Sequence, residues 1–134
     1  MEQRIEAAQL VPGRGNPIQD AVVVLADGQI SYAGPRDAAP ATPGADTTHA
    51  QTVMPGMWDC HGHLMGLRST DMNDMMHEPI ALRAARCVAS LRACLDAGFT
   101  SVREVGGLGI HLARAVAEGT IEGPTIYAAG TALR

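Results

Sequence analysis

The pattern of apolar and polar residues divides the chain into a first part made of short strands and a second part in which strands and helices alternate. In the first part, short apolar and β-branched runs are separated by turn-forming residues. Four strands are predicted, over residues 4–11, 21–25, 29–33 and 51–54. Asp27-Gly28 is a hairpin signal between the second and the third of them. Residues 37–50 are rich in Ala, Pro, Thr and Gly without a clear period, so we expect a surface loop there.

After residue 78 the apolar residues recur every three or four positions, as they do in helices. A helix is predicted over residues 79–97, with Pro79 in its first turn and Gly98 at its end. Its apolar face is expected to consist of Ile80, Ala84, Val88, Leu91 and Leu95. The elements that follow are a strand over residues 99–105, a helix over 110–118 and a strand over 125–129. This alternation predicts an α/β fold with a parallel sheet.

Composition excludes several classes of protein. The 134 residues carry a formal net charge of −4 and lack a basic cluster, so we expect no nucleic-acid partner. There is neither a long apolar run nor a signal peptide, so we expect no membrane association and a cytoplasmic location. Three cysteines do not make a disulfide framework, and Cys87 and Cys94 are expected to be buried free thiols.

The candidate chemistry lies between Met54 and His63. His61 and His63 are separated by one residue, so on a regular strand Asp59, His61 and His63 would all point to the same face. Zinc and related ions readily bind neutral imidazole nitrogen, so such a strand can provide half of a catalytic metal site. A His-x-His pair by itself is more often explained by two histidines on the surface.

The residues around this pair resemble the N-terminal signature of the metal-dependent amidohydrolase superfamily. That signature is a Pro-Gly turn followed by Asp-x-His-x-His on the first strand of a (β/α)8 barrel, and Pro55-Gly56, Asp59, His61 and His63 match it position by position. The stretch is most similar to the subgroup of imidazolonepropionase-like and prolidase-like hydrolases. The resemblance implies a divalent metal cofactor, zinc, with His61 and His63 as its ligands in this chain.

The resemblance also implies a fold. Residues 1–54 would form part of a small β-sandwich, and residues 55–134 would form the first three strands and two helices of a partial (β/α)8 TIM barrel. A whole barrel takes roughly 250 residues, so about a quarter to a third of one would be present. The superfamily's other metal ligands and its general base, an aspartate on strand eight, would lie beyond residue 134. The catalytic residues are therefore not identified within this sequence.

These implications lead to one expected function and two alternatives. We expect an N-terminal fragment of a metal-dependent hydrolase that cleaves an amide, peptide or cyclic C–N bond of a small molecule or peptide, and that is inactive alone. The first alternative is a non-catalytic truncated homologue that acts as a binding or assembly module. The second is a small metal-binding protein that gathers further ligands by oligomerising. Because strands cut from a barrel leave open edges, we also expect self-association or a complementing chain.

Several other residues keep two interpretations each. The Met-rich segment 64–77 is long for a strand-to-helix connection, and it either covers a substrate or packs through its methionines. Arg103 and Glu104, at a strand end, either reach the pocket or form a buried ion pair without a chemical role. Arg68 is a weak candidate for binding a substrate carboxylate. His77 is expected to cap or pack rather than to bind a metal, and His111 is expected to be a surface or capping residue.

Overall fold

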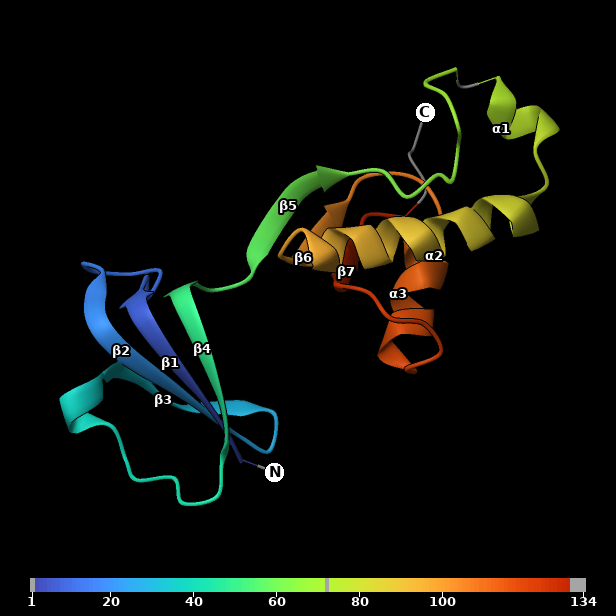
Figure 1. Cartoon of the computed structure of the whole chain (residues 1–134). Coiled ribbons are helices and arrows are strands. Elements are labelled where there is room, and N and C mark those ends of the chain that lie inside the picture. The colour runs from blue at the N-terminus through green and yellow to red at the C-terminus, as the bar shows by residue number, and fades with distance from the viewer. Residues whose placement is uncertain (1, 72, 131–134) are drawn as a thin grey trace. The chain divides into compact units, whose positions relative to one another are not determined.

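The computed structural model describes residues 2–71 and 73–130, and the contacts within it divide the chain into two units, Met1–Pro55 and Gly56–Arg134 (Figure 1). The first unit is a four-stranded sheet in the order β3-β2-β1-β4. Its elements are β1 (Glu2–Leu10), β2 (Ile18–Ala26), β3 (Gln29–Pro35), the 3-10 helix η1 (Arg36–Ala38) and β4 (Asp46–Val53). β2 runs antiparallel to both β1 and β3, whereas β4 runs parallel to β1.

The predicted hairpin between β2 and β3 is confirmed. Asp27 and Gly28 both have positive φ values, 51° and 76°, as a two-residue hairpin turn requires. On one face of the sheet, Leu10, Ala21 and Val23 are buried and form its small core. The described residues of this unit form a single four-stranded sheet, and the expectation that residues 1–54 are part of a small β-sandwich stays a prediction.

The predicted loop over residues 37–50 is too long. β4 already begins at Asp46, and it pairs with β1 from Gln3↔Asp46 to Leu10↔Val53. Most of its side chains are exposed, so no alternation of apolar and polar residues marks it in the sequence. Backbone pairing with a strand more than 40 positions away, rather than local pattern, therefore defines this strand.

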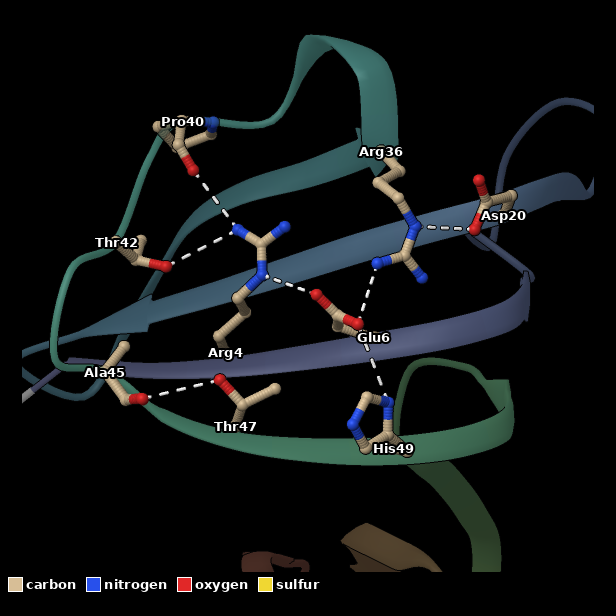
Figure 2. Close-up of polar contacts among 9 residues, drawn as sticks. All are labelled: Arg4, Glu6, Asp20, Arg36, Pro40, Thr42, Ala45, Thr47 and His49. Carbon is tan, nitrogen blue, oxygen red and sulfur yellow. Dashed lines mark hydrogen bonds and ion pairs between the residues drawn. The ribbon is translucent and has the colours of Figure 1, made fainter.

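A polar network covers part of this sheet (Figure 2). The Glu6 carboxylate lies between two guanidinium groups, 3.0 Å from Nε of Arg4 and 2.7 Å from Nη1 of Arg36. Arg36 also contacts Oδ1 of Asp20 at 2.6 Å, and Nδ1 of His49 lies 3.6 Å from Glu6. The hydrogen bond from Arg36, followed by that from Arg4, holds the pKa of Glu6 below its ordinary value.

The second unit contains a three-stranded parallel sheet in the order β5-β6-β7. Its elements are β5 (Met57–Gly62), α1 (Asp74–His77), α2 (Ile80–Asp96), β6 (Phe99–Glu104), α3 (Gly109–Ala117) and β7 (Thr125–Ala128). The parallel α/β arrangement is as predicted. The strand around Val102, β6, pairs with both β5 and β7, so the strand around Ile126, β7, is not a neighbour of β5. Figure 1 shows the chain passing from β5 through α1 before it enters α2.

The core of this unit lies between the sheet and its helices, and it differs from the predicted helix face. Its buried residues are Leu64, Cys87, Leu91, Leu108, Leu112 and Ile126. In α2 the buried stripe is Arg83, Cys87 and Leu91, whereas Ile80 and Val88 are 63% and 39% exposed. The predicted face was wrong at Ile80 and Val88, and it left out Arg83 and Cys87. Arg83 is buried with its Nε donating to the carbonyl of Met65 at 2.8 Å.

Three further findings bear on the predictions from composition. Cys87 is buried and Cys94 half-buried, both as free thiols, and Cys60 is exposed. Burial raises the pKa of both Cys87 and Cys94. None of the helices in residues 2–71 and 73–130 has the length and apolarity needed to cross a membrane.

Candidate metal site

Strand β5 does not keep the regular alternation that the sequence predicts. Asp59 pairs with Val102 and Gly62 pairs with Glu104, so three steps along β5 match two along β6. The extra residue is a β-bulge, which re-aims the side chains that follow it. A side chain on Gly62 would have no room, since a Cβ there would lie 2.9 Å from Cγ1 of Val102 and 3.3 Å from Oδ2 of Asp59.

As a result, Asp59 does not share a face with the two histidines. It pairs with the buried Val102, and its carboxylate adds to the effect of burial in raising the pKa of Cys94, which lies on α2. Its Oδ1 accepts the backbone N–H of His61 at 3.0 Å. The expectation of a common face is therefore wrong for Asp59, whose carboxylate instead holds the backbone of the bulge.

The two histidines do lie together. Their ring centroids are 5.3 Å apart, with an angle of 69° between the ring planes, and both side chains are exposed. Two imidazoles that bind one ion through nitrogen at about 2.1 Å, with a roughly tetrahedral angle between them, have centroids about 5 Å apart. The observed separation therefore fits a pair of ligands to a single ion.

The ring of His63 is fixed by a hydrogen bond. Its Nδ1 lies 3.0 Å from the carbonyl oxygen of Gly106, in the segment that follows β6. A carbonyl oxygen only accepts, so Nδ1 carries the proton in this contact and Nε2 of the neutral ring keeps its lone pair. Histidines that ligate metals commonly donate their other ring nitrogen to a carbonyl or carboxylate in this way.

The two histidines do not make a complete metal site by themselves. Among residues 2–71 and 73–130, no group of three or more His, Cys, Asp or Glu side chains is arranged to hold a metal ion. Structural zinc sites use four protein ligands, and catalytic sites commonly use three and a water molecule. The pair can thus provide part of a site, and further ligands have to come from elsewhere.

Arg103 and Glu104 do not form the buried ion pair that was one of the two interpretations of them. Arg103 is exposed, and its Nε donates to the carbonyl of Cys60 at 2.7 Å, which is a contact with the bulge of β5. Glu104 is only 1% exposed, and its Oε1 accepts backbone N–H groups rather than an arginine. The two residues therefore form no ion pair, and Glu104 does not face the pocket. The sequence indicated Glu104 as a candidate but not its hydrogen bonds to the backbone.

The segment after His63 forms a pocket beside it. The pocket has a volume of about 530 Å³, and it is lined by His63, by Met65–Leu67 with Ser69 and Thr70, and by Arg86 and Ser90 of α2. The carbonyl of Gly66 accepts from Nη1 of Arg86 at 3.2 Å, and Arg86 also pairs with Glu78. Of the methionines in segment 64–77, Met65 lines the pocket, whereas Met76 is 77% exposed. Met72 lies outside the described residues.

Two aromatic residues lie on the strands of the same sheet. Trp58 of β5 and Tyr127 of β7 stack with centroids 4.9 Å apart and an interplanar angle of 25°, and both are about half exposed. A second pocket of about 680 Å³ is lined by Arg103, Val105 and Tyr127 with the two alanines that follow it. Residues near the carboxyl ends of the parallel strands thus line both pockets, and ligand sites of open α/β sheets lie at such ends.

In comparisons with known proteins, the chain is similar to several hydrolases. No protein-family model matches the chain. The ochratoxinase of Aspergillus niger is 37% identical over 136 residues, which covers 96% of this chain and 28% of that protein. An imidazolonepropionase of Sphingopyxis alaskensis is 37% identical over 107 residues, which covers 72% of this chain and 27% of that protein.

Solved structures give the same result. The crystal structure of A. niger ochratoxinase superposes with a TM-score of 0.86 and 33% identity, covering 96% of this chain and 31% of that one. A prolidase complexed with N-methylphosphonate-L-proline superposes with a TM-score of 0.84 and 30% identity, covering 98% of this chain and 32% of that one. The chain therefore spans about a third or less of the length of the proteins it matches.

Proposed function

Because this chain belongs to the amidohydrolase superfamily and corresponds to an N-terminal portion of its members, we propose that it supplies two metal ligands, His61 and His63, to a hydrolase of C–N bonds. The observation that carries the proposal is the pair of imidazoles, 5.3 Å apart at the end of β5, with Nδ1 of one ring held by a backbone carbonyl. We propose zinc as the ion, because it binds imidazole nitrogen readily.

When bound, zinc polarises a carbonyl oxygen and lowers the pKa of a water ligand to about 7. The residues of this chain hold and shape the site. The Gly106 carbonyl keeps the proton of His63 on Nδ1, so Nε2 is available to bind. Asp59 fixes the backbone of His61 through its N–H group. Arg83 and Arg86 tie the pocket wall to α2 through the carbonyls of Met65 and Gly66.

We propose an amide, a peptide or a cyclic amide as the substrate class. The names of the related proteins support this choice, since they include a prolidase and an imidazolonepropionase. The pocket beside His63 combines apolar side chains with the hydroxyl groups of Ser69 and Thr70, which suits a small molecule or a short peptide.

We further propose that these 134 residues are inactive alone. The chain matches 28% of the length of ochratoxinase, and its described residues offer two adjacent ligands where a catalytic zinc ion commonly has three. Within residues 2–71 and 73–130, the two acids on the strands next to the histidines, Asp59 and Glu104, both accept backbone N–H groups, so we assign neither of them as the general base for the attacking water. We therefore expect weak zinc binding and no turnover from the isolated chain.

A chimera tests the proposal. This chain would replace the matching segment of A. niger ochratoxinase, and hydrolysis of an amide substrate of that enzyme would be measured together with bound zinc. We expect the chimera to be active, His61→Ala and His63→Ala to abolish turnover, and the control His111→Ala, at an exposed position of α3, to retain it. Activity that survives both histidine substitutions would contradict the proposal. A folded, zinc-loaded but inactive chimera would favour the non-catalytic module instead.

A further inference from the structure

Glu104 is a buried acid for which the proposed reaction has no direct use. It is 1% exposed, and it ranks among the largest fully buried side chains of the described residues. From its contacts we propose that Glu104 is the positioning residue for His63, holding both the backbone that follows His63 and the carbonyl that binds the His63 ring. The function of this arrangement rests on the proposed metal site, but the arrangement itself can be tested without a metal.

One carboxylate oxygen of Glu104 connects two segments of the chain. Oε1 accepts the backbone N–H of Gly106 at 3.1 Å and that of Leu64 at 3.4 Å. Leu64 directly follows His63, and Gly106 provides the carbonyl that lies 3.0 Å from Nδ1 of His63. The same oxygen therefore holds the peptide next to the imidazole and the residue that orients the imidazole.

Backbone hydrogen bonds complete the connection. Beyond the ends of β5 and β6, the N–H of Val105 donates to the carbonyl of Gly62 at 3.0 Å, and that of Leu108 donates to the carbonyl of Leu64 at 2.8 Å. These two bonds flank His63. The N–H groups of Leu64 and Gly106 have Glu104 as their acceptor, so this side chain replaces the strand partner that they lack.

The surrounding chain leaves the carboxylate little room. A Cβ on Gly107 would lie 2.7 Å from Oε1, and one on Gly109 would lie 2.3 Å from Oε2. Gly106 and Gly107 also have φ values of 151° and 152°, a conformation that side chains disfavour. The Gly-Gly segment thus wraps closely around Glu104, which excludes this carboxylate from contact with a substrate.

The environment of Cys87 supports this placement in the core. Burial raises the pKa of the Cys87 thiol, the charge of Arg83 lowers it, and the charge of Glu104 raises it. Glu104 therefore lies on the side of the sheet that packs against α2, beneath the segment that carries His63. Its effect on the site passes through the two amides and the Gly106 carbonyl.

The test compares Glu104→Leu with Glu104→Gln in the full chain, without added metal. Leucine has no oxygen to accept the N–H groups of Leu64 and Gly106. Glutamine keeps one carbonyl oxygen, which can accept both of them. Nitrogen-15 NMR above the ordinary imidazole pKa of about 6.5 reports which ring nitrogen of His63 carries the proton. Amide hydrogen exchange reports the hydrogen bonds of Leu64 and Gly106, and His49 in the separate N-terminal unit serves as the reference.

We expect the wild-type His63 to be protonated at Nδ1 and the Leu64 and Gly106 amides to be protected from exchange. In Glu104→Leu, we expect His63 to populate both tautomers and the two amides to exchange at least about tenfold faster, while Glu104→Gln retains the wild-type pattern. Retention of the Nδ1 proton and of amide protection in a folded Glu104→Leu chain would overturn the proposal.

The wild-type measurement keeps the proposal falsifiable if Glu104→Leu does not fold. Unprotected Leu64 and Gly106 amides in the wild-type chain would themselves overturn it. The role of Glu104 and the proposed metal site can also fail independently of each other. A chain in which Glu104 orients His63 but zinc does not bind would contradict the metal site alone, whereas zinc binding with an unfixed His63 ring would contradict the role of Glu104 alone.

Discussion

Nδ1 of His63 lies 3.0 Å from the carbonyl oxygen of Gly106, a residue 43 positions further along the chain. This contact joins the ends of two neighbouring strands, and it determines which nitrogen of the imidazole is free to bind an ion. The local motif supplies the histidine, but the residue that orients it belongs to a different β/α unit. The candidate metal site therefore depends on the packing of the segment after β6.

Substitution of Gly107 should disturb this packing more than substitution of a glycine with open space around it. Gly107→Ala would place a Cβ 2.6 Å from the carbonyl oxygen of Leu64, at a φ value of 152°. Gly119→Ala, the matched control, has a φ value of 71° but nothing within 4 Å. We expect the control to lose about 1 kcal/mol from the free energy of unfolding, through backbone strain alone, and Gly107→Ala to lose roughly 1–3 kcal/mol more.

Urea unfolding followed by circular dichroism measures both losses. Equal losses in the two variants would show that the segment around Gly107 has more freedom than its close contacts indicate.

The network around Glu6 should make stability depend on acid pH. Arg36, followed by Arg4, lowers the pKa of Glu6 in the folded chain below its ordinary value of 4.5. A group with a lowered folded-state pKa stabilises the fold above its unfolded-state pKa, and this contribution is lost as the pH falls through the folded-state pKa. We expect the urea midpoint of the wild type to fall in this acid range and that of Glu6→Gln to fall less.

The effect should be small, because Glu6 and its two arginines remain partly accessible to solvent. Titration of the urea midpoint from neutral pH downward, at low ionic strength, checks it. Parallel pH profiles for the wild type and Glu6→Gln would contradict the role of this network.

The second unit should associate with itself or with a complementing chain. In the part of the chain that the structure describes, residues 2–71 and 73–130, β5 and β7 each pair only with β6. Each of these two strands therefore has one edge without a strand partner. Trp58 and Tyr127 add an exposed aromatic stack. We expect Trp58→Ser to reduce the association, as measured by size-exclusion chromatography with light scattering.

Trp58 is the only tryptophan of the chain, so its fluorescence reports directly on β5. A blue shift of its emission with rising protein concentration would accompany association. A clean monomer with a sharp thermal transition, and with emission independent of concentration, would contradict this prediction.

Local patterns predicted those parts of the structure that depend on neighbouring residues. The Asp27-Gly28 hairpin, the span of α2 and the strand–helix alternation of the second unit all follow from short-range signals. The two histidines were also expected to lie together, and their rings do.

Features set by distant pairing were not predictable in the same way. The bulge that turns Asp59 away from the histidines arises from the register between β5 and β6, although Gly62 within the strand was a signal of a bulge. The buried stripe of α2 includes Arg83, whose partner is a backbone carbonyl of the loop before the helix. Glu104 accepts from the backbone amide of Leu64, 40 positions before it, and from that of Gly106, two positions after it.

The central claim is that His61 and His63 bind one ion together, and a zinc titration followed by nitrogen-15 NMR of the histidine rings tests it most directly. We predict that the ring signals of His61 and His63 shift together and before those of His49, His77 and His111. We also predict that either His61→Ala or His63→Ala removes the response of the remaining partner, and that His111→Ala does not. Zinc that acts first on another histidine, or that acts on His61 and His63 independently of each other, would contradict the claim.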